Sequence, residues 1–405
     1  MARRLTDEVA GLPRRRHGDE ELTSVVVRLG DDGFGVILDG IGDERGAAPI
    51  VQNLLSCVAQ PYSIDGEQVS ITASIGIALL PDEADDPDTL IRNGDNALHQ
   101  SRQRGPGRYR FFDQSMHADA SRRLRVSNLL RRAIDLRALE LHYQPRVRPE
   151  SREVLGFEAL ARWTDPELGK VSPEEFIPIA ESTGSIAELS DWCIETAAHQ
   201  LQEWHALGFD DLSISVNLAR LNLNSRLVNR VLSVTENLDR AKFELEVTES
   251  LLIEEGDEAI GVLAELRKHG FRIALDDFGT GYSSLSYLQG LPLDAVKIDR
   301  SFIRRIARDS DAAALTGSML SMCHALSLHT VVEGVQTKAQ CEVLLKLGCD
   351  EAQGFLFGKP MRADRALAFL RRKATLANGK HGEPEKDRTS GRPTGRTRAR
   401  TTKKA

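Results

Sequence analysis

Acidic side chains recur at one kind of position between residues 158 and 333: at or just beyond the ends of short apolar runs. Carboxylates that converge on one edge repel one another unless cations lie among them. Oxygen ligands without His or Cys suit Mg²⁺ or Mn²⁺, and two such ions can hold both the attacking and the leaving oxygen of a displacement at phosphorus. The pattern predicts a metal site for phosphoryl chemistry at which the following residues converge: Glu158, Asn217, Glu246, Asp276, Asp277, Lys297, Glu333 and Gln353.

The apolar runs that carry these residues alternate with helical patterns. Eight runs separated by seven helical stretches predict an α/β fold of the (β/α)8 TIM-like barrel type, whose active sites lie at the carboxyl ends of the strands. An amphipathic helix over residues 124–139 leads into this barrel. The predicted strands cover residues 139–143, 155–160, 212–218, 243–247, 272–275, 295–298, 331–332 and 351–356.

An ordered series of short motifs resembles the EAL family. A lone Glu-Ala-Leu carries no information, whereas eight motifs in the family's order and spacing are specific. The motifs are YQP at 143–145, EALARW at 158–163, SVNL at 215–218, EVTE at 246–249, DDFGTG at 276–281, KIDRSF at 297–302, EGV at 333–335 and QGF at 353–355.

The resemblance implies metal-dependent hydrolysis of cyclic di-(3′,5′)-guanylate (cyclic di-GMP) to linear pGpG. By that likeness Lys297 orients the attacking water, and Glu333 acts as general base or second-metal ligand. Glu249 supports the loop after Asp277, and family members often form homodimers near this loop. The family's metal positions are matched by Glu158, Asn217, Glu246, Asp276 and Asp277, and its substrate contacts by Gln144, Arg162 and Gln353.

One departure from the motifs leaves a second function open. Gln336 stands where the family usually has a second glutamate after Glu333, so a weak or inactive domain that senses cyclic di-GMP is the first alternative. A metal-independent barrel glycosidase built on paired carboxylates is another. At single positions, an ion pair of Lys297 with Asp299 and core packing of Trp163 are the structural alternatives.

Residues 1–115 are predicted to form a partial α/β domain that resembles the second half of a GGDEF-type cyclase. A hairpin is predicted from runs at 24–29 and 34–38, then helices at 50–59 and 89–102 and a strand at 69–79. The loop Asp31-Asp32-Gly33 lacks the glutamate of the GGDEF family. Too few residues precede Val25 for the family's first strand and helix. Glu21 and Ser24 stand where the family has the residues of its product-inhibition site. We expect no cyclase activity; a dimerisation or regulatory role, a remnant and a truncated gene model all remain open.

Composition divides the chain further. The 405 residues carry a formal charge of −7, but residues 377–405 hold nine basic and three acidic side chains. This Gly- and Pro-rich tail is predicted to be disordered, and we expect it to keep the protein soluble rather than to bind nucleic acid. No signal or membrane-spanning run is present, and the five Cys include no C-x-x-C pair, so we expect a cytoplasmic protein with free thiols. The predicted divisions are 1–115, a linker at 116–124, the barrel at 125–375 and the tail at 376–405.

Overall fold

The computed structural model describes residues 1–11, 16–17, 20–21, 24–30, 33–41, 43–64, 66–80, 86–103, 105–218, 223–279 and 285–379. The chain divides into two compact units, Met1–Leu129 and Leu130–Ala405. Among the described residues, no helix combines the length and the apolar character that crossing a bilayer requires.

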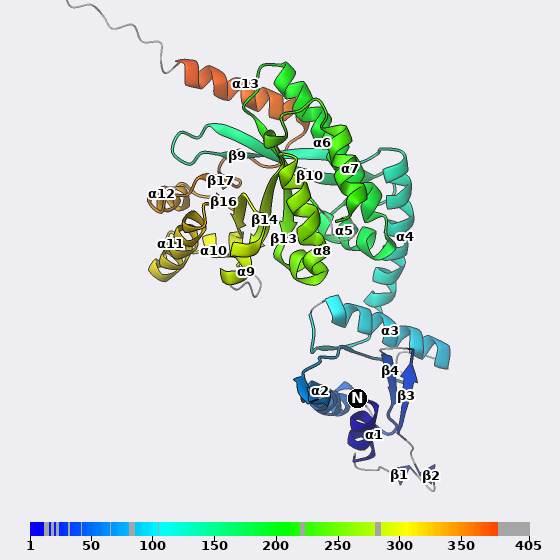
Figure 1. The fold of residues 1–405 in the computed structure, drawn as a ribbon. Coiled ribbons are helices and arrows are strands. Elements are labelled where there is room, and N and C mark those ends of the chain that lie inside the picture. The colour runs from blue at the N-terminus through cyan, green and yellow to red at the C-terminus, as the bar shows by residue number, and fades with distance from the viewer. Residues whose placement is uncertain are drawn as a thin grey trace, which may run out of the picture. The chain divides into compact units, whose positions relative to one another are not determined.

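The second unit is a closed eight-stranded barrel (Figure 1). Neighbouring strands run parallel from β10 to β17, and β9 closes the barrel by pairing antiparallel with both β17 and β10. A short ninth strand, β11 (Gly169–Val171), forms an antiparallel hairpin with the end of β10. The barrel strands are β9 (Glu140–Val147), β10 (Val154–Asp165), β12 (Ser213–Asn217), β13 (Phe243–Thr248), β14 (Arg272–Phe278), β15 (Ala295–Ile298), β16 (His329–Val332) and β17 (Glu351–Gln353).

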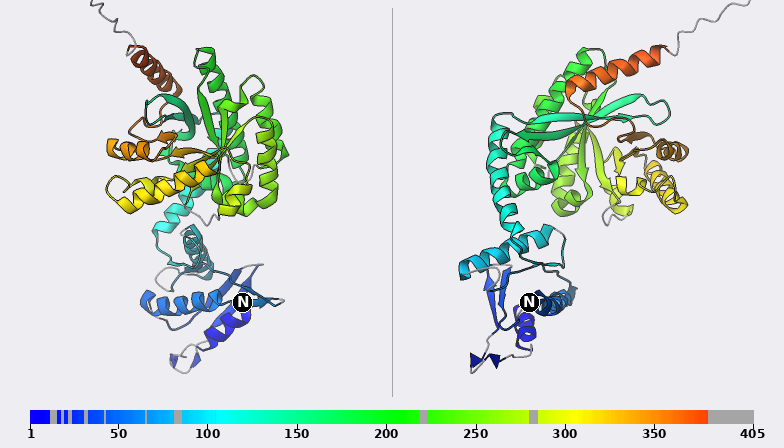
Figure 2. Two further views of the ribbon diagram at one scale, coloured as in Figure 1. Left: turned by 60° about the vertical axis from the view of Figure 1, so that its left-hand side comes forward. Right: turned by 180° about the vertical axis from the view of Figure 1, so that it is seen from behind.

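Helices cover the outside of the barrel (Figures 1 and 2). The strands are buried over most of their length, as β15 and β17 show by being buried at every position. The helices of this unit are α5 (Pro173–Thr183), α6 (Ile186–Ala206), α7 (Ser225–Val234), the 3₁₀ turn η2 (Arg240–Lys242), α8 (Glu249–Lys268), α9 (Leu285–Gly290), α10 (Arg300–Ile303), α11 (Ser310–Ala325), α12 (Lys338–Lys346) and α13 (Ala363–Gly379).

The predicted barrel is confirmed, but its first connection differs from the prediction. A turn over residues 148–153 joins β9 to β10 where a helix was expected, which makes β9 antiparallel. The first strand runs four residues beyond its predicted end, and the eighth stops at Gln353 because Gly354 turns the chain with φ of 156°. The helix ahead of the barrel, α4 (Ser115–Asp135), begins nine residues earlier than predicted.

The first unit is a small α/β structure. The hairpin of β3 (Val25–Leu29) and β4 (Gly33–Ile37) is confirmed, and the predicted helices are α2 (Glu44–Ala59) and α3 (Pro87–Gln103). The strand expected at 69–79 is shorter, β7 (Ile75–Ile77), and pairs parallel with β8 (Tyr109–Phe111). Its other elements are α1 (Ala2–Ala10), β1 (Arg16–His17), β2 (Glu20–Glu21), β5 (Tyr62–Ile64) and β6 (Glu67–Val69).

Two predictions fall on residues that the structure does not describe. Asp31 and Asp32, the acidic pair of the hairpin loop, lie outside the described residues, and so does the tail from 380 to 405. Helix α13 extends to Gly379, four residues past the predicted end of the barrel.

Candidate metal centre at the carboxyl ends of the barrel strands

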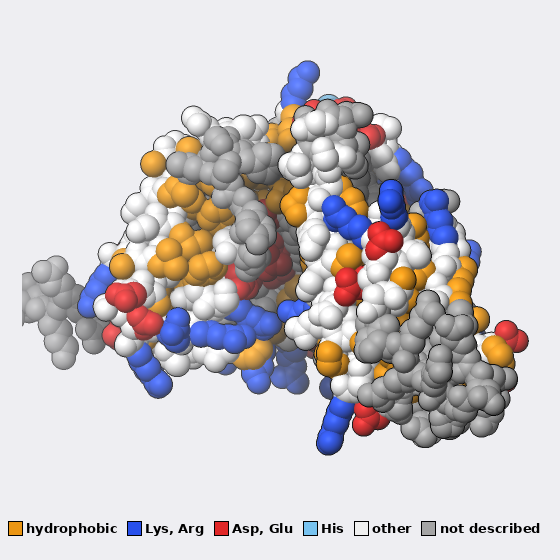
Figure 3. All heavy atoms as spheres, turned by 90° about the horizontal axis from the view of Figure 1, so that it is seen from below, with side chains coloured by type: hydrophobic (Ala, Val, Ile, Leu, Met, Phe, Trp, Pro, Cys, Tyr) orange, Lys and Arg blue, Asp and Glu red, His pale blue; other side chains and the backbone are white. Residues whose placement is uncertain are grey.

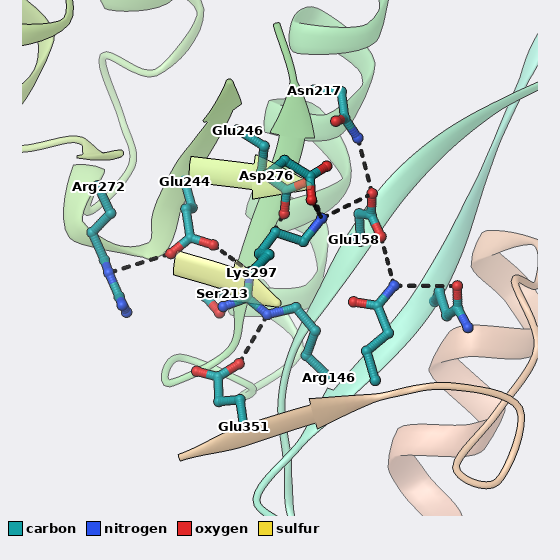
Figure 4. A network of polar contacts seen from close by, with 12 residues as sticks. Arg146, Glu158, Ser213, Asn217, Glu244, Glu246, Arg272, Asp276, Lys297 and Glu351 are labelled. Carbon is teal, nitrogen blue, oxygen red and sulfur yellow. Dashed lines mark hydrogen bonds and ion pairs between the residues drawn. The ribbon is translucent and has the colours of Figure 1, made fainter. Parts of the chain in front are cut away.

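Parallel strands bring the predicted acidic residues together. Register places Glu246 of β13 opposite Asn217 of β12, and Glu158 of β10 opposite Ser215, two residues before Asn217. Asp276 follows on β14, and Glu333 comes directly after β16. The side chains of Glu158, Asn217, Glu246 and Asp276 point toward one another in Figure 4, which also draws Lys297 of β15 among them.

Lys297 is the cation at the centre of this group. Its ammonium is fully buried, and Nζ lies 2.7 Å from Glu246 Oε2, 2.8 Å from Glu333 Oε1, 3.1 Å from Asp276 Oδ1 and 3.5 Å from Glu158 Oε1. One positive charge therefore faces four carboxylates. The alternative of an ion pair with Asp299 is wrong, because Asp299 instead caps α10 by accepting a hydrogen bond from the Ser301 N–H at 2.8 Å.

The acids are placed to hold a cation. Ligand oxygens of Glu158, Glu246 and Asp276 all lie within 4.8 Å of one another. Within the described part of the chain, the buried Oε1 of Glu246 has no hydrogen-bond partner. A buried acceptor without a donor is costly, and a hard divalent cation satisfies it, so the residues fit Mg²⁺ or Mn²⁺.

Asn217 and Asp277 lie beside this three-acid cluster. Asn217 Nδ2 donates a hydrogen bond to Glu158 Oε1 at 2.9 Å. Asp277 is exposed and has a φ of 56°, and its backbone N–H donates to Asp276 Oδ1 at 2.9 Å. A non-glycine residue at positive φ is uncommon and marks a constrained backbone.

Burial and mutual repulsion shift the titration of these groups. Burial raises the pKa of Glu246 well above its ordinary value, although Lys297 opposes the shift. Burial also raises the pKa of Glu333, to about 7, against the attraction of Lys297. Burial alone would raise the pKa of Glu158, but Lys297 and hydrogen bonds from Gln353 and Asn217 hold it below its ordinary value.

Two of the predicted substrate contacts lie directly beside Glu158. Gln353 Nε2 donates to Glu158 Oε2 at 2.5 Å and to Gln144 Oε1 at 3.2 Å. Both glutamines are at most 8% exposed. Arg162, four residues further along β10, is half-buried and donates to the Ala161 carbonyl at 2.8 Å.

Three further predictions concern side chains around this site. Glu249 is buried at the start of α8, and neither carboxylate oxygen has a hydrogen-bond partner among the described residues. Residues 280–284, the loop it was expected to support, lie outside the description, so that role stays a prediction. Gln336 is exposed. Trp163 belongs to the core, 2% exposed and edge-on to Phe176 with ring centroids 6.0 Å apart.

The sequence reasoning missed a second set of buried charges. Arg146 of β9 is 1% exposed and donates hydrogen bonds to Glu244 and Glu351, as Figure 4 shows. One signal was available: Glu244 precedes Glu246 by two residues, and residues two apart on a strand share a face. Nothing in the sequence near Arg146 indicated burial, because its strand was predicted to end at residue 143.

Charges of both signs also meet on the surface. On the face seen in Figure 3, acidic side chains gather close to a row of Lys and Arg side chains. Such a surface can attract cations and anions to neighbouring places.

Comparison with known proteins agrees with the motifs. The EAL domain model matches residues 127–360, and the model described as diguanylate cyclase, GGDEF domain matches residues 16–108. One solved structure, described as the PaMucR phosphodiesterase in complex with c-di-GMP, is 41% identical with a TM-score of 0.57. It covers 60% of this chain and 99% of its own.

Curated relatives extend across both units. The bifunctional diguanylate cyclase/cyclic di-GMP phosphodiesterase MucR of Pseudomonas aeruginosa is 40% identical over 85% of this chain and 51% of its own length. The cyclic di-GMP phosphodiesterase NbdA of the same organism is 37% identical over 86% of this chain and 45% of its own. The chain thus spans about half the length of these relatives. Because the EAL model covers more than half of the chain, from residue 127 to residue 360, this protein belongs to the EAL domain family.

Proposed function

We propose that this protein hydrolyses cyclic di-GMP to linear pGpG with Mg²⁺ or Mn²⁺, using two ions. The observation that carries the proposal is the buried cluster of Glu158, Glu246 and Asp276 around Lys297. Membership of the EAL family supports the substrate, because relatives in that family are named cyclic di-GMP phosphodiesterases.

Each residue has a stated part in this reaction. When bound, the divalent ions supply Lewis acidity at the phosphodiester and lower the pKa of a water molecule. Lys297 offers ammonium hydrogens that orient this water and offset charge on the phosphoryl oxygens. Glu333, 2.8 Å from Lys297, is placed to accept the proton of the water or to bind the second ion.

The remaining site residues hold the ions and the substrate. Asn217 and Asp277 flank the three-acid cluster, and their oxygens would complete the ligand set with those of Glu158, Glu246 and Asp276. Gln144, Gln353 and Arg162 would contact the dinucleotide. The two glutamines are held in place without substrate, because Gln353 donates hydrogen bonds to both Glu158 and Gln144.

A sensor without turnover is the second candidate, and Gln336 is the observation that favours it. In the family a glutamate usually stands here, and an amide cannot ionise. The side chain of Gln336 is exposed, however, and its backbone N–H is held by Gln340 Oε1 at 2.9 Å. The substitution therefore leaves the buried cluster intact, which favours an enzyme.

The test is a hydrolysis assay of the full chain with Mn²⁺ and cyclic di-GMP, with pGpG resolved by chromatography. We expect linear product from the unaltered protein and no detectable product from Glu158→Ala, since that change removes a proposed metal ligand and the partner of Asn217 and Gln353. Glu265→Ala, at an exposed position of α8, is the matched control and should retain full activity.

Two outcomes of this assay separate the alternatives. Tight binding of cyclic di-GMP without product in the unaltered protein would establish the sensor. Activity that survives EDTA would contradict a metal-dependent reaction, whereas the glycosidase alternative predicts no pGpG at all, with or without metal. The homodimer, the cytoplasmic location and the lack of cyclase activity stay predictions. Light scattering on the purified chain tests the dimer.

A further inference from the structure

A second layer of charged side chains lies inside the barrel next to the metal cluster. Arg146 of β9 donates through Nε to Glu351 Oε2 of β17 at 2.8 Å and through Nη1 to Glu244 of β13. All three side chains are at most 5% exposed. Arginine presents a rigid planar fork, so two carboxylates from different strands fix its guanidinium.

This layer is linked to the metal cluster through one residue. Glu246 Oε1 lies 3.8 Å from Arg146 Nη1, while Glu246 Oε2 lies 2.7 Å from Lys297 Nζ. Glu244 and Glu246 project from the same face of β13. The Glu246 carboxylate is therefore held between two buried cations that come from different strands (Figure 4).

We infer that Arg146 is a positioning residue for the metal ligand Glu246, and that it sets how tightly the three-acid cluster takes up a divalent cation. The inference rests on the proposed metal centre. A ligand carboxylate that can turn freely loses rotational freedom when it binds an ion. Arg146 attracts the Oε1 side of the carboxylate and limits this rotation before any ion arrives, and residues that orient metal ligands typically change metal affinity by about 10–100-fold when mutated.

A purely structural role for Arg146 is the competing explanation. In that case Arg146 serves only to neutralise Glu244 and Glu351, and its loss changes stability but not metal affinity. Replacing Arg146 alone removes the buried cation between Glu244 and Glu351. Among the described residues, these carboxylates then keep only Arg272 at 3.5 Å and His329 at 2.9 Å, and the loss of the cation can unfold the protein. The test therefore uses a variant in which the whole layer is neutral, Arg146→Met with Glu244→Gln and Glu351→Gln, beside the single change Arg146→Lys.

The measurement is the dissociation constant of Mn²⁺, taken by calorimetry on the full chain, with circular dichroism and a urea titration to verify folding. We expect the neutral-layer variant to bind Mn²⁺ about 10–100-fold more weakly. Arg146→Lys keeps the charge without the fork and should recover part of the affinity. The control is His329→Gln, because His329 Nε2 contacts Glu351 Oε1 at 2.9 Å but does not contact Glu246.

The outcomes separate this inference from the proposed function. If the neutral-layer variant is folded and Mn²⁺ binds as it does to the unaltered protein, the inference is wrong and the metal centre stands. If the neutral-layer variant does not fold, Arg146→Lys decides, since affinity equal to that of the unaltered protein contradicts a role for the fork. If the unaltered protein takes up no Mn²⁺, both this inference and the metal centre are wrong.

Discussion

The Lys297 side chain determines whether four neighbouring carboxylates can coexist in the ion-free protein. Removing one partner from a buried ionic cluster typically costs about 3–5 kcal/mol. We therefore predict that Lys297→Met lowers the free energy of unfolding by about 3–5 kcal/mol in EDTA, and that added Mn²⁺ restores part of the loss. Urea unfolding followed by circular dichroism measures both effects.

The control for this change is Lys338→Met, at an exposed position on α12. An exposed substitution of this kind changes stability by less than about 0.5 kcal/mol. A loss for Lys297→Met no larger than that of Lys338→Met would show that the carboxylates do not depend on the lysine for their neutralisation.

Glu351 predicts a dependence of stability on pH. Burial alone would raise the pKa of this carboxyl, but Arg146 and His329 hold it far below its ordinary value of 4.5. A depressed folded-state pKa contributes stability above the unfolded-state pKa, and this contribution is lost as the pH falls below about 4.5. We predict that the difference in unfolding free energy between the unaltered protein and Glu351→Gln is full at pH 7 and shrinks between pH 4.5 and pH 3.

Urea titrations at several pH values measure this difference. Glu265→Gln, at an exposed site, is the matched control and should show no such pH dependence. A difference for Glu351→Gln that stays constant from pH 7 to pH 3 would contradict the role of Arg146 in holding Glu351 ionised.

At the scale of single residues, the acids of the site and Lys297 could be predicted from the sequence, and the supporting Arg146 could not. Glu158, Glu246 and Asp276 stand near the ends of recognisable apolar runs, and the barrel rule then brings them together. Arg146 is the second-last residue of β9 and pairs with both neighbouring strands, on which its burial depends. Charged residues are rarely buried, so a local pattern favours an exposed position for Arg146.

Among the elements, the antiparallel first strand is the feature that the sequence pattern concealed. A parallel connection needs a dozen or more residues, whereas the six residues 148–153 suffice for a hairpin. With the strand predicted to end at 143, the connection seemed long enough for a crossover. The error in one boundary therefore produced the error in strand direction.

The segments that follow β16 and β17 pack so closely against each other that the first residue after β17 must be glycine. Gly354 has φ of 156°, and a Cβ built there would lie 2.1 Å from the Val335 carbonyl oxygen. Val335 also accepts from Leu356 and donates to the Gln353 carbonyl, each at 3.0 Å. We predict that Gly354→Ala lowers the free energy of unfolding by about 3 kcal/mol or more, through backbone strain and the loss of these two bonds.

Urea unfolding of the Gly354→Ala variant and the unaltered protein measures this loss. Gly261→Ala is the control. Gly261 lies inside α8, and a Cβ there would meet nothing within 4 Å. Alanine is the better helix former, so Gly261→Ala should stabilise the protein by about 0.5–1 kcal/mol. Equal effects from the two changes would show that the contact between the β16 and β17 loops tolerates a side chain.

At the scale of the whole molecule, composition and motif order predicted two folded parts, while the helix between them was harder to place. Helix α4 begins at Ser115, inside the first unit, and its last residues belong to the second. Apolar spacing found its later half, where Leu130 and Ile134 are buried. The earlier part, residues 115–123, includes Met116 but three charged residues, Asp119, Arg122 and Arg123, and has too few large apolar positions to show a helical period.

The two-unit division predicts that the barrel with its leading helix folds by itself. We expect residues 115–379 to unfold in one cooperative step and to hydrolyse cyclic di-GMP in the presence of Mn²⁺. A shorter fragment, 138–379, lacks α4 and with it the burial of Leu130 and Ile134. Since burial of one such side chain is worth about 1.5–3 kcal/mol, the shorter fragment should be less stable by at least about 3 kcal/mol.

Urea unfolding of both fragments and the hydrolysis assay beside the full chain provide the comparison. Equal rates for 115–379 and the full chain would mean that the first unit does not regulate the isolated enzyme, whereas a difference would assign it an inhibitory or activating role by its sign. Non-cooperative unfolding of 115–379 would contradict the independence of the barrel unit. Equal stability of the two fragments would show that α4 contributes no core, despite the complete burial of Leu130.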